Sequence, residues 1–258
     1  MVKGWQRFSA HFAGYGDQFV LIGGTAADLA MADAGLEFRA TKDLDIVLVI
    51  EALTPAFVDR FWTFIAAGGY EIQQSADSQR PKRYRFVRAA VDEFPHMLEL
   101  FTRRPEQLSL PPDARITRIP DDGSSLSAIL LDETYYAFVL AGRRWTTEGM
   151  PWVGHDRLIP LKASAWGNLT RDRTEGKSVR DADIRKHAQD VRTLSQLLRE
   201  DERVELPERV YGELIDLLEA GLADMRVGAT EAAVATAVAR LRTAFVLRAD
   251  ERNRRIRK

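Results

Sequence analysis

Residues 19–50 read FVLIGGTAADLAMADAGLEFRATKDLDIVLVI, and this stretch decides the fold class. It begins with four apolar residues, 19–22, that stop at a glycine pair, a pattern typical of a short buried strand. A helical pattern follows over residues 26–34, and residues 43–50 form a second strand-like run. The stretch therefore predicts a strand, a tight turn into a helix, and a second strand.

The second of these strands carries two acidic side chains near its start. Because side chains alternate between the two faces of a strand, Asp43 and Asp45 share one face, with Cα atoms roughly 6.6 Å apart. Two carboxylates on a mostly buried strand repel each other and resist desolvation. A bound magnesium ion removes both problems, since it prefers carboxylate oxygens at about 2.0–2.1 Å and keeps positions for phosphate oxygens. The pair therefore predicts a magnesium site.

The glycine pair before the helix indicates a phosphate-binding turn. Gly23 and Gly24 leave backbone N–H groups available at a helix start and let a phosphate approach the main chain closely. Thr25 follows them directly and can add a hydroxyl donor. The turn would hold nucleotide phosphates, and the acid pair would hold the metal that bridges them.

A third acid is expected if the site binds two metals. Glu99 is the best candidate, because it alternates with Leu98 and Leu100 in the run 96–101 and so faces away from the apolar side. It would complete the cluster if this run pairs beside residues 43–49. Taken singly, a glycine turn, an acidic pair and a strand glutamate each have simpler explanations. Their order and spacing together favour metal-dependent nucleotide chemistry.

The rest of the chain changes character near residue 130. Before this point, short apolar runs alternate with helical patterns; after it, helical periodicity dominates. The sequence thus predicts an α+β fold with an α/β domain in residues 1–130 and a C-terminal helical bundle in residues 131–258. Further strands are expected at 70–73, 83–88, 96–101 and 125–131, and helices at 56–67, 132–141, 161–171, 179–198, 207–222 and 230–250.

Composition is that of an ordinary soluble globular protein, with 45% hydrophobic and 29% charged residues in 258 and a net charge of -1. The chain has no cysteine, which excludes disulfides, thiolate metal sites and cysteine nucleophiles. No apolar run reaches the roughly 20 residues that span a bilayer. We expect a cytoplasmic protein without membrane contact.

Basic residues are concentrated in two segments of this nearly neutral chain. Residues 171–186 contain six basic and four acidic side chains, and residues 248–258 contain six basic and two acidic ones. Local basic patches can attract phosphates even when the whole protein is neutral. A solvated helix end is the simpler explanation of the C-terminal segment.

The stretch 21–49 resembles the glycine motif and Asp-x-Asp strand of the DNA polymerase beta-like nucleotidyltransferases. More narrowly, GGTAADLA…FRATKDLDIVL is similar to the AbiEii-like and MenT-like enzymes, which are toxins of toxin–antitoxin and abortive-infection systems. In the second half, LIPLKASAWGNLTRD (158–172) and DIRKHAQDVRTLSQLL (183–198) resemble a helical segment of that family with a lysine and a later basic-x-x-x-Asp pattern. The resemblance implies a nucleotidyltransferase-type mixed sheet with flanking helices.

The resemblance also implies roles for individual residues. Asp43 and Asp45 would bind the metals, expected to be two magnesium ions with manganese as a substitute; Glu99 is the third ligand expected from its strand position. Lys162 would neutralise the triphosphate, and Asp190 would position it or the acceptor. Without the resemblance, a lysine at the start of an expected helix is more often a solvent-exposed charge. The expected nucleotide contacts come from Gly23, Gly24, Thr25, Thr41 and Lys162.

The activity implied is transfer of a nucleoside monophosphate from an NTP to an acceptor hydroxyl, with pyrophosphate as the leaving group. The expected acceptor is RNA, in particular the 3′ end of tRNA, and a cognate antitoxin is a further expected partner. One alternative is a small-molecule nucleotidyltransferase of the aminoglycoside-modifying type. The other is a non-catalytic regulatory module with a degenerate nucleotide site, against which the intact Asp43 and Asp45 argue.

Overall fold

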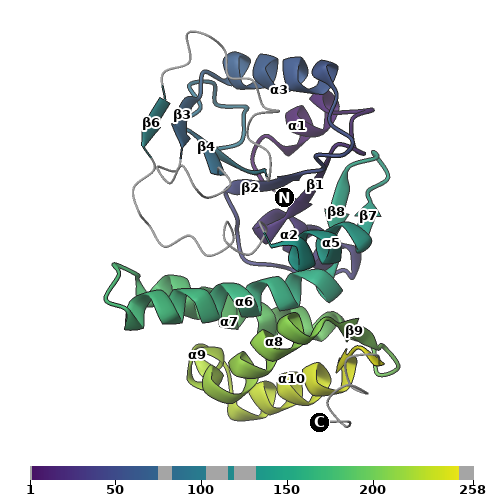
Figure 1. Cartoon of the computed structure of the whole chain (residues 1–258), viewed down its shortest axis with the longest axis vertical. Helices are drawn as coiled ribbons and strands as arrows, with labels where there is room; N and C mark the ends of the chain where they lie inside the picture. The colour runs from purple at the N-terminus through teal and green to yellow at the C-terminus, as the bar shows by residue number, and fades with distance from the viewer. Residues whose placement is uncertain (1, 75–82, 103–115, 119–131, 250–258) are drawn as a thin grey trace. The chain divides into compact units, whose positions relative to one another are not determined.

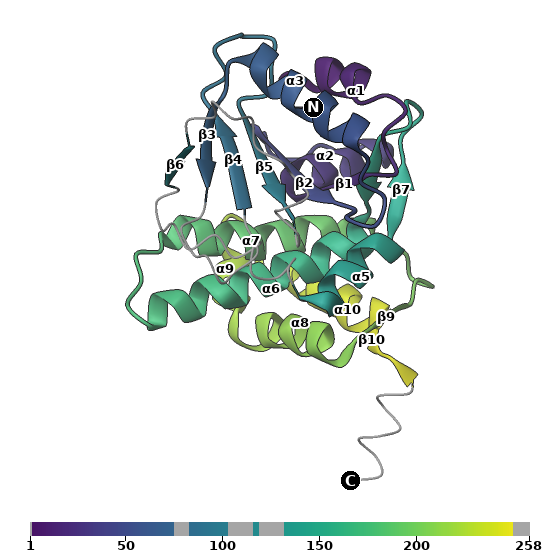
Figure 2. The same ribbon diagram turned by 45° about the horizontal axis from the view of Figure 1, so that its top comes forward.

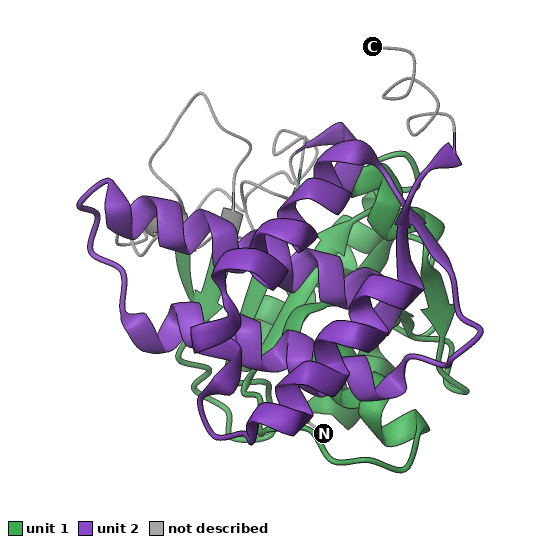
Figure 3. Ribbon diagram, turned by 90° about the horizontal axis from the view of Figure 1, so that it is seen from below, with its two compact units in different colours: residues 1–121, 136–154 green, residues 122–135, 155–258 purple. Residues whose placement is uncertain are grey.

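The computed structural model describes residues 2–74, 83–102, 116–118 and 132–249. The chain divides into two compact units, one of residues 1–121 with 136–154 and one of residues 122–135 with 155–258 (Figure 3). The strand expected at 125–131 and the basic positions after residue 249 lie outside the described residues.

A mixed eight-stranded sheet forms the centre of the described part of the first unit (Figure 1). Its strand order is β6-β3-β4-β5-β2-β1-β8-β7. β2 pairs parallel with β5 and antiparallel with β1, so β5 and β2 occupy the middle of the sheet, with β1 next to them. The strands are β1 (Phe19–Ile22), β2 (Asp43–Leu48), β3 (Glu71–Gln74), β4 (Arg83–Val87), β5 (Met97–Phe101), β6 (Ile116–Arg118), β7 (Arg143–Trp145) and β8 (Pro151–Val153).

Helices flank this sheet, and the expectation of a mixed α+β fold is confirmed. α1 (Trp5–His11) and α3 (Pro55–Gly68) lie together beside the sheet (Figure 2), and α2 (Gly23–Asp33) packs on β1 and β2. α3 begins where Thr54 caps it: the Thr54 hydroxyl accepts a hydrogen bond from the Phe57 N–H, ahead of a proline at the first helical position.

Alternation around the charged residues of β2, β5 and β4 separates an apolar face from one with charged side chains. On the apolar face, Leu44, Leu98 and Phe86 are register neighbours on β2, β5 and β4, and all are buried. Phe86 packs edge-on against Phe61 of α3, with ring centroids 5.3 Å apart. Residues next in sequence to these, including Asp45, therefore point to the opposite face.

The division between the units differs from the boundary expected after residue 130. β8 pairs parallel with β1, with Leu21 opposite Trp152, and this pairing brings residues 136–154 into the first unit. The division falls within α5 (Glu133–Ala141). That helix begins as expected, because the Asp132 carboxylate accepts a hydrogen bond from the Thr134 N–H at 2.9 Å.

The second unit is mainly helical in its described part. α6 packs against both α7 and α8, and α7 also packs against α9. A two-stranded parallel sheet of β9 and β10 accompanies these helices. The elements are α6 (His155–Thr174), α7 (Asp181–Leu194), β9 (Val204–Leu206), α8 (Glu208–Ala220), α9 (Leu222–Arg226), α10 (Glu231–Ala244) and β10 (Phe245–Leu247).

The largest differences from the expected helix boundaries in this unit are at the start of α6 and the end of α10. α6 begins at His155 rather than at 161 and includes Pro160, so the proline does not mark the helix start. α10 ends at Ala244 rather than near 250. The next three residues form β10, in which Phe245 pairs with Val204 of β9. None of the helices in the described part of the chain has the length and hydropathy to cross a bilayer.

Candidate nucleotide and metal site

The topology of β1, α2 and β2 brings a helix start beside an acidic side chain. β1 runs antiparallel to β2, and its last residue, Ile22, is the register partner of Asp45. α2 begins at the next residue, Gly23. Asp43 and Asp45 lie on one face of β2, and both are partly exposed. The start of α2 therefore lies next to the Asp45 carboxylate, and Asp43 shares the strand face of Asp45.

Both glycines of the turn are required by close contacts. Gly23 has a φ of 64°, and a Cβ there would lie 1.8 Å from Oδ2 of Asp45. A Cβ on Gly24 would lie 2.4 Å from Oγ1 of Thr41. Glycine thus lets the main chain approach the Asp45 carboxylate and the Thr41 hydroxyl. Thr41 is partly exposed at this position, which suits its expected place at the nucleotide.

Thr25 has a different role from the one expected. Its side chain is fully buried, and its hydroxyl donates a 2.9 Å hydrogen bond to the main-chain carbonyl of Asp43. The hydroxyl therefore holds the start of α2 against the start of β2. A phosphate contact by this hydroxyl does not fit the geometry, because the third residue of the helix faces the neighbouring strand.

Glu99 lies beside Asp45, as the expected strand pairing requires. β5 is parallel to β2, and Asp45 and Glu99 are register partners on the same face. Oε1 of Glu99 accepts a hydrogen bond from Nε of Arg85 on β4, and the two form an ion pair. Their side chains are 8% and 16% exposed. Sequence reasoning missed Arg85, although its alternation with the buried Tyr84 and Phe86 places it on the polar face.

Asp43 and Asp45 could hold magnesium together with ligands from outside the protein, rather than in a site made of protein ligands alone. In the part of the chain that the structure describes, no cluster of three or more histidine, aspartate or glutamate side chains is arranged to hold a metal ion. One or two carboxylates can instead hold magnesium together with water and substrate phosphates. The acid pair suits this second mode, because the start of α2, where helix N–H groups can bind a phosphate, lies against Asp45.

Lys162 and Asp190 both belong to the second unit, where they bind each other. Lys162 extends from α6, and its Nζ lies 2.7 Å from Oδ2 of Asp190 on α7. The two side chains are only 5% and 3% exposed. The alternative of an exposed lysine is therefore wrong. Burying both charges costs desolvation energy, and their mutual attraction offsets part of this cost.

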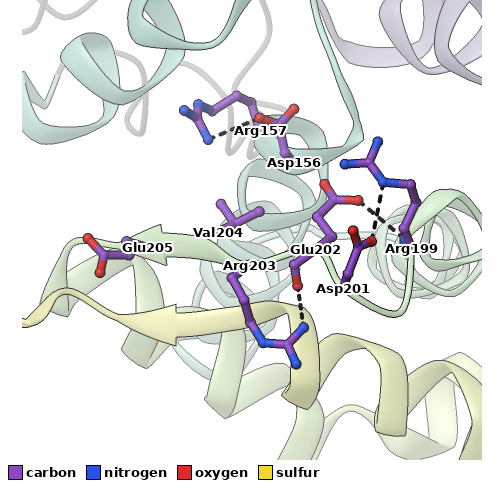
Figure 4. A pocket seen from close by; sticks show the side chains of 8 residues that line it. All are labelled: Asp156, Arg157, Arg199, Asp201, Glu202, Arg203, Val204 and Glu205. Carbon is purple, nitrogen blue, oxygen red and sulfur yellow. Dashed lines mark hydrogen bonds and ion pairs between the residues drawn. The ribbon is translucent and has the colours of Figure 1, made fainter.

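A charged hollow of about 510 Å³ opens in the second unit between the start of α6 and the turn before β9 (Figure 4). Ion pairs join Arg157 to Asp156 at 3.2 Å and Arg199 to Asp201 at 3.5 Å. None of the residues predicted from the sequence lines it, so it is separate from the candidate site. The lining residues are Asp156, Arg157, Arg199, Asp201, Glu202, Arg203, Val204 and Glu205.

Comparison with models of known protein families gives no match, and neither curated proteins nor solved structures give one. The functional assignment therefore depends on the residues of the acid pair and the glycine turn themselves.

Substituting Gly23 by alanine is expected to destabilise the first unit more than substituting Gly35. Both glycines have positive φ, 64° and 70°, so both alanine variants lose about 1–2 kcal/mol to backbone strain. Nothing lies within 4 Å of a Cβ on Gly35, whereas the one on Gly23 collides with Asp45. We expect this collision to cost a further 1–3 kcal/mol or so in urea unfolding. Equal stabilities for the two variants would show that the turn is not pressed against Asp45.

Proposed function

We propose that this protein is a magnesium-dependent nucleotidyltransferase that moves a nucleoside monophosphate from an NTP to an acceptor hydroxyl. The observation that carries the proposal is the carboxylate pair Asp43 and Asp45 beside the glycine turn at the start of α2. A helix N-terminus attracts phosphate through its free N–H groups and its dipole. Carboxylates on the neighbouring strand supply the ligands that magnesium prefers.

Each part of the site has a distinct task in this reaction. Gly23 and Gly24 let the main chain of α2 bind the triphosphate, and Thr25 fixes that helix start to β2. Asp43 and Asp45 would hold magnesium, which supplies charge stabilisation at the reacting phosphate when bound. The acceptor oxygen forms a bond to the α-phosphorus while the bond to the bridging oxygen breaks. Pyrophosphate leaves with that electron pair, and the acceptor proton passes to solvent.

RNA is the acceptor that we propose, with the 3′ end of tRNA as the first candidate. The support is the resemblance to AbiEii-like and MenT-like toxins, which also suggests an antitoxin partner and a cytoplasmic location. Exposed basic residues at the end of α6 are compatible with RNA. Arg173 pairs with Asp181 and Lys177 with Asp172, each at 2.6 Å. Exposed pairs of this kind are weak and can exchange a carboxylate for a phosphate.

The decisive experiment supplies each of the four NTPs, labelled at the α-phosphate, with total tRNA or with an aminoglycoside. Transfer of label to tRNA supports the proposed activity. Transfer only to the small molecule would favour the alternative enzyme. Nucleotide binding without transfer to any acceptor would favour the regulatory module.

Charge reversal of Arg171 and Arg173 is expected to weaken RNA binding about tenfold. The slope of log affinity against log salt concentration should fall in magnitude by the amount that corresponds to one or two lost phosphate contacts. Binding of magnesium and NTP should change less than about twofold, because neither residue belongs to the phosphate turn. The matched control reverses Arg240 and Arg242, which are exposed on α10. RNA affinities are measured by filter binding at several salt concentrations. Equal affinities for the two double variants would show that the end of α6 does not bind RNA.

A further inference from the structure

Three acids share the polar face of the sheet at the candidate site. Asp43 and Asp45 lie on β2, and Glu99 lies on β5 directly beside Asp45 in the register. Carboxylates on neighbouring positions of one face repel each other unless a cation lies among them. A second metal ion at Glu99 is one solution. The structure contains another, because Arg85 is the register partner of Glu99 on β4.

The ion pair of Arg85 and Glu99 is built into the sheet. Both residues are in regular strands, between buried neighbours: Tyr84 and Phe86 flank Arg85. The side chains are 16% and 8% exposed, so both charges are largely withdrawn from water. Charges in such surroundings need a partner of opposite sign, and losing that partner is costly. Glu99 therefore has its charge compensated before any metal arrives.

The ion pair of Glu99 disfavours a metal ion at that carboxylate. A metal bound to Glu99 would lie close to the Arg85 guanidinium and would be repelled by it. A metal bound between Asp43 and Asp45 keeps the ion pair of Glu99 intact.

We propose that Arg85 takes the place of a second cation at this face, so that Glu99 is the ion-pair partner of Arg85 rather than a metal ligand. The protein without nucleotide then binds a single divalent ion through Asp43 and Asp45. This inference rests on the proposed function in one respect, since it takes that acid pair as the metal site. It replaces the expectation that Glu99 completes a two-metal cluster.

Titration of the nucleotide-free protein with Mn²⁺, followed by electron paramagnetic resonance, tests the proposal. Wild-type protein should bind one ion. The variant R85M/E99Q removes both charges of the pair at once, so its Mn²⁺ affinity should stay within about threefold of wild type. The variant R85M leaves Glu99 uncompensated beside Asp45. It should bind Mn²⁺ about tenfold more tightly or bind a second ion.

Two results would overturn the proposal. One is a loss of Mn²⁺ affinity of about tenfold or more in R85M/E99Q, which would make Glu99 a ligand. The other is unchanged Mn²⁺ binding in R85M. If R85M does not fold, the double variant and R85K test the proposal instead. R85K keeps the positive charge and should bind one ion, as wild type does.

In the same titration, D43N/D45N should bind no ion. If it binds Mn²⁺ as wild type does, the proposed metal site fails, whatever Arg85 does.

Discussion

Replacing either Asp43 or Asp45 by asparagine should reduce nucleotidyl transfer by a factor of about 10³ or more. Asparagine keeps the shape of the side chain but has no charge with which to hold magnesium at the triphosphate. The free energy of unfolding should stay the same or rise, because each variant removes one member of a self-repelling pair on β2. Initial rates at saturating NTP and urea unfolding curves measure the two quantities.

Asp33→Asn is the matched control for these variants. Asp33 is an exposed residue at the end of α2, in the same unit but at the opposite end of the helix from the glycine turn. Its variant should retain wild-type transfer. Near wild-type transfer by Asp43→Asn or Asp45→Asn would contradict the assignment of the acid pair as metal ligands.

Lys162→Met is expected to destabilise the second unit by about 3–5 kcal/mol. The substitution removes the lysine from the Asp190 carboxylate, which is 3% exposed, and breaking a buried ion pair by removing one partner is costly. Removing both charges in Lys162→Met/Asp190→Leu should recover most of the loss, because similar-sized apolar side chains avoid the desolvation penalty. Urea unfolding of the two variants and wild type measures both effects.

The control for Lys162 is Arg173→Met, which breaks an ion pair of the same unit at the surface. The Arg173 and Asp181 side chains are 46% and 58% exposed, so this loss should be under about 1 kcal/mol. Equal losses for the two methionine variants would show that the pair of Lys162 and Asp190 is not a buried structural bridge. Only the double variant separates stability from catalysis. If it folds stably and still fails to use NTP, Lys162, Asp190 or both are needed for the reaction itself.

The elements next to the acid pair could be predicted because their signals are local. Residues 19–22 form the predicted strand, and the strand predicted at 43–50 spans 43–48. Both are short apolar runs bounded by glycine or by charged residues, and each has a neighbouring strand on both sides in the sheet. Glu99 lies beside Asp45, as expected. The alternation of Glu99 with leucines on either side predicts which sheet face it occupies, whatever strand it pairs with.

The features that were missed depend on partners distant in sequence. Nothing local distinguishes residues 245–247 from the helix before them; they become a strand because Val204–Leu206 is there to pair with. β8 likewise becomes a strand beside β1, across more than a hundred residues. The hydroxyl of Thr25 could not be assigned from the sequence, because its acceptor is a main-chain carbonyl of another element.

The ion pair between Arg85 and Glu99, at the candidate site itself, could not be predicted from the sequence either. Alternation places each side chain on the polar face, but only the register of β4 against β5 makes them direct neighbours. The sequence alone therefore favoured Glu99 as a third metal ligand, since three acids on one face need positive charge. The structure shows that part of this charge comes from an arginine.

Parallel reactions with NTP labelled at the α- or the γ-phosphate test the central claim most directly. With magnesium and total tRNA, the α-label should enter the acceptor and the γ-label should leave as pyrophosphate. EDTA and Asp45→Asn should each abolish incorporation. No α-label in any acceptor with magnesium or manganese, or equal incorporation by Asp45→Asn, would contradict nucleotidyl transfer at this site.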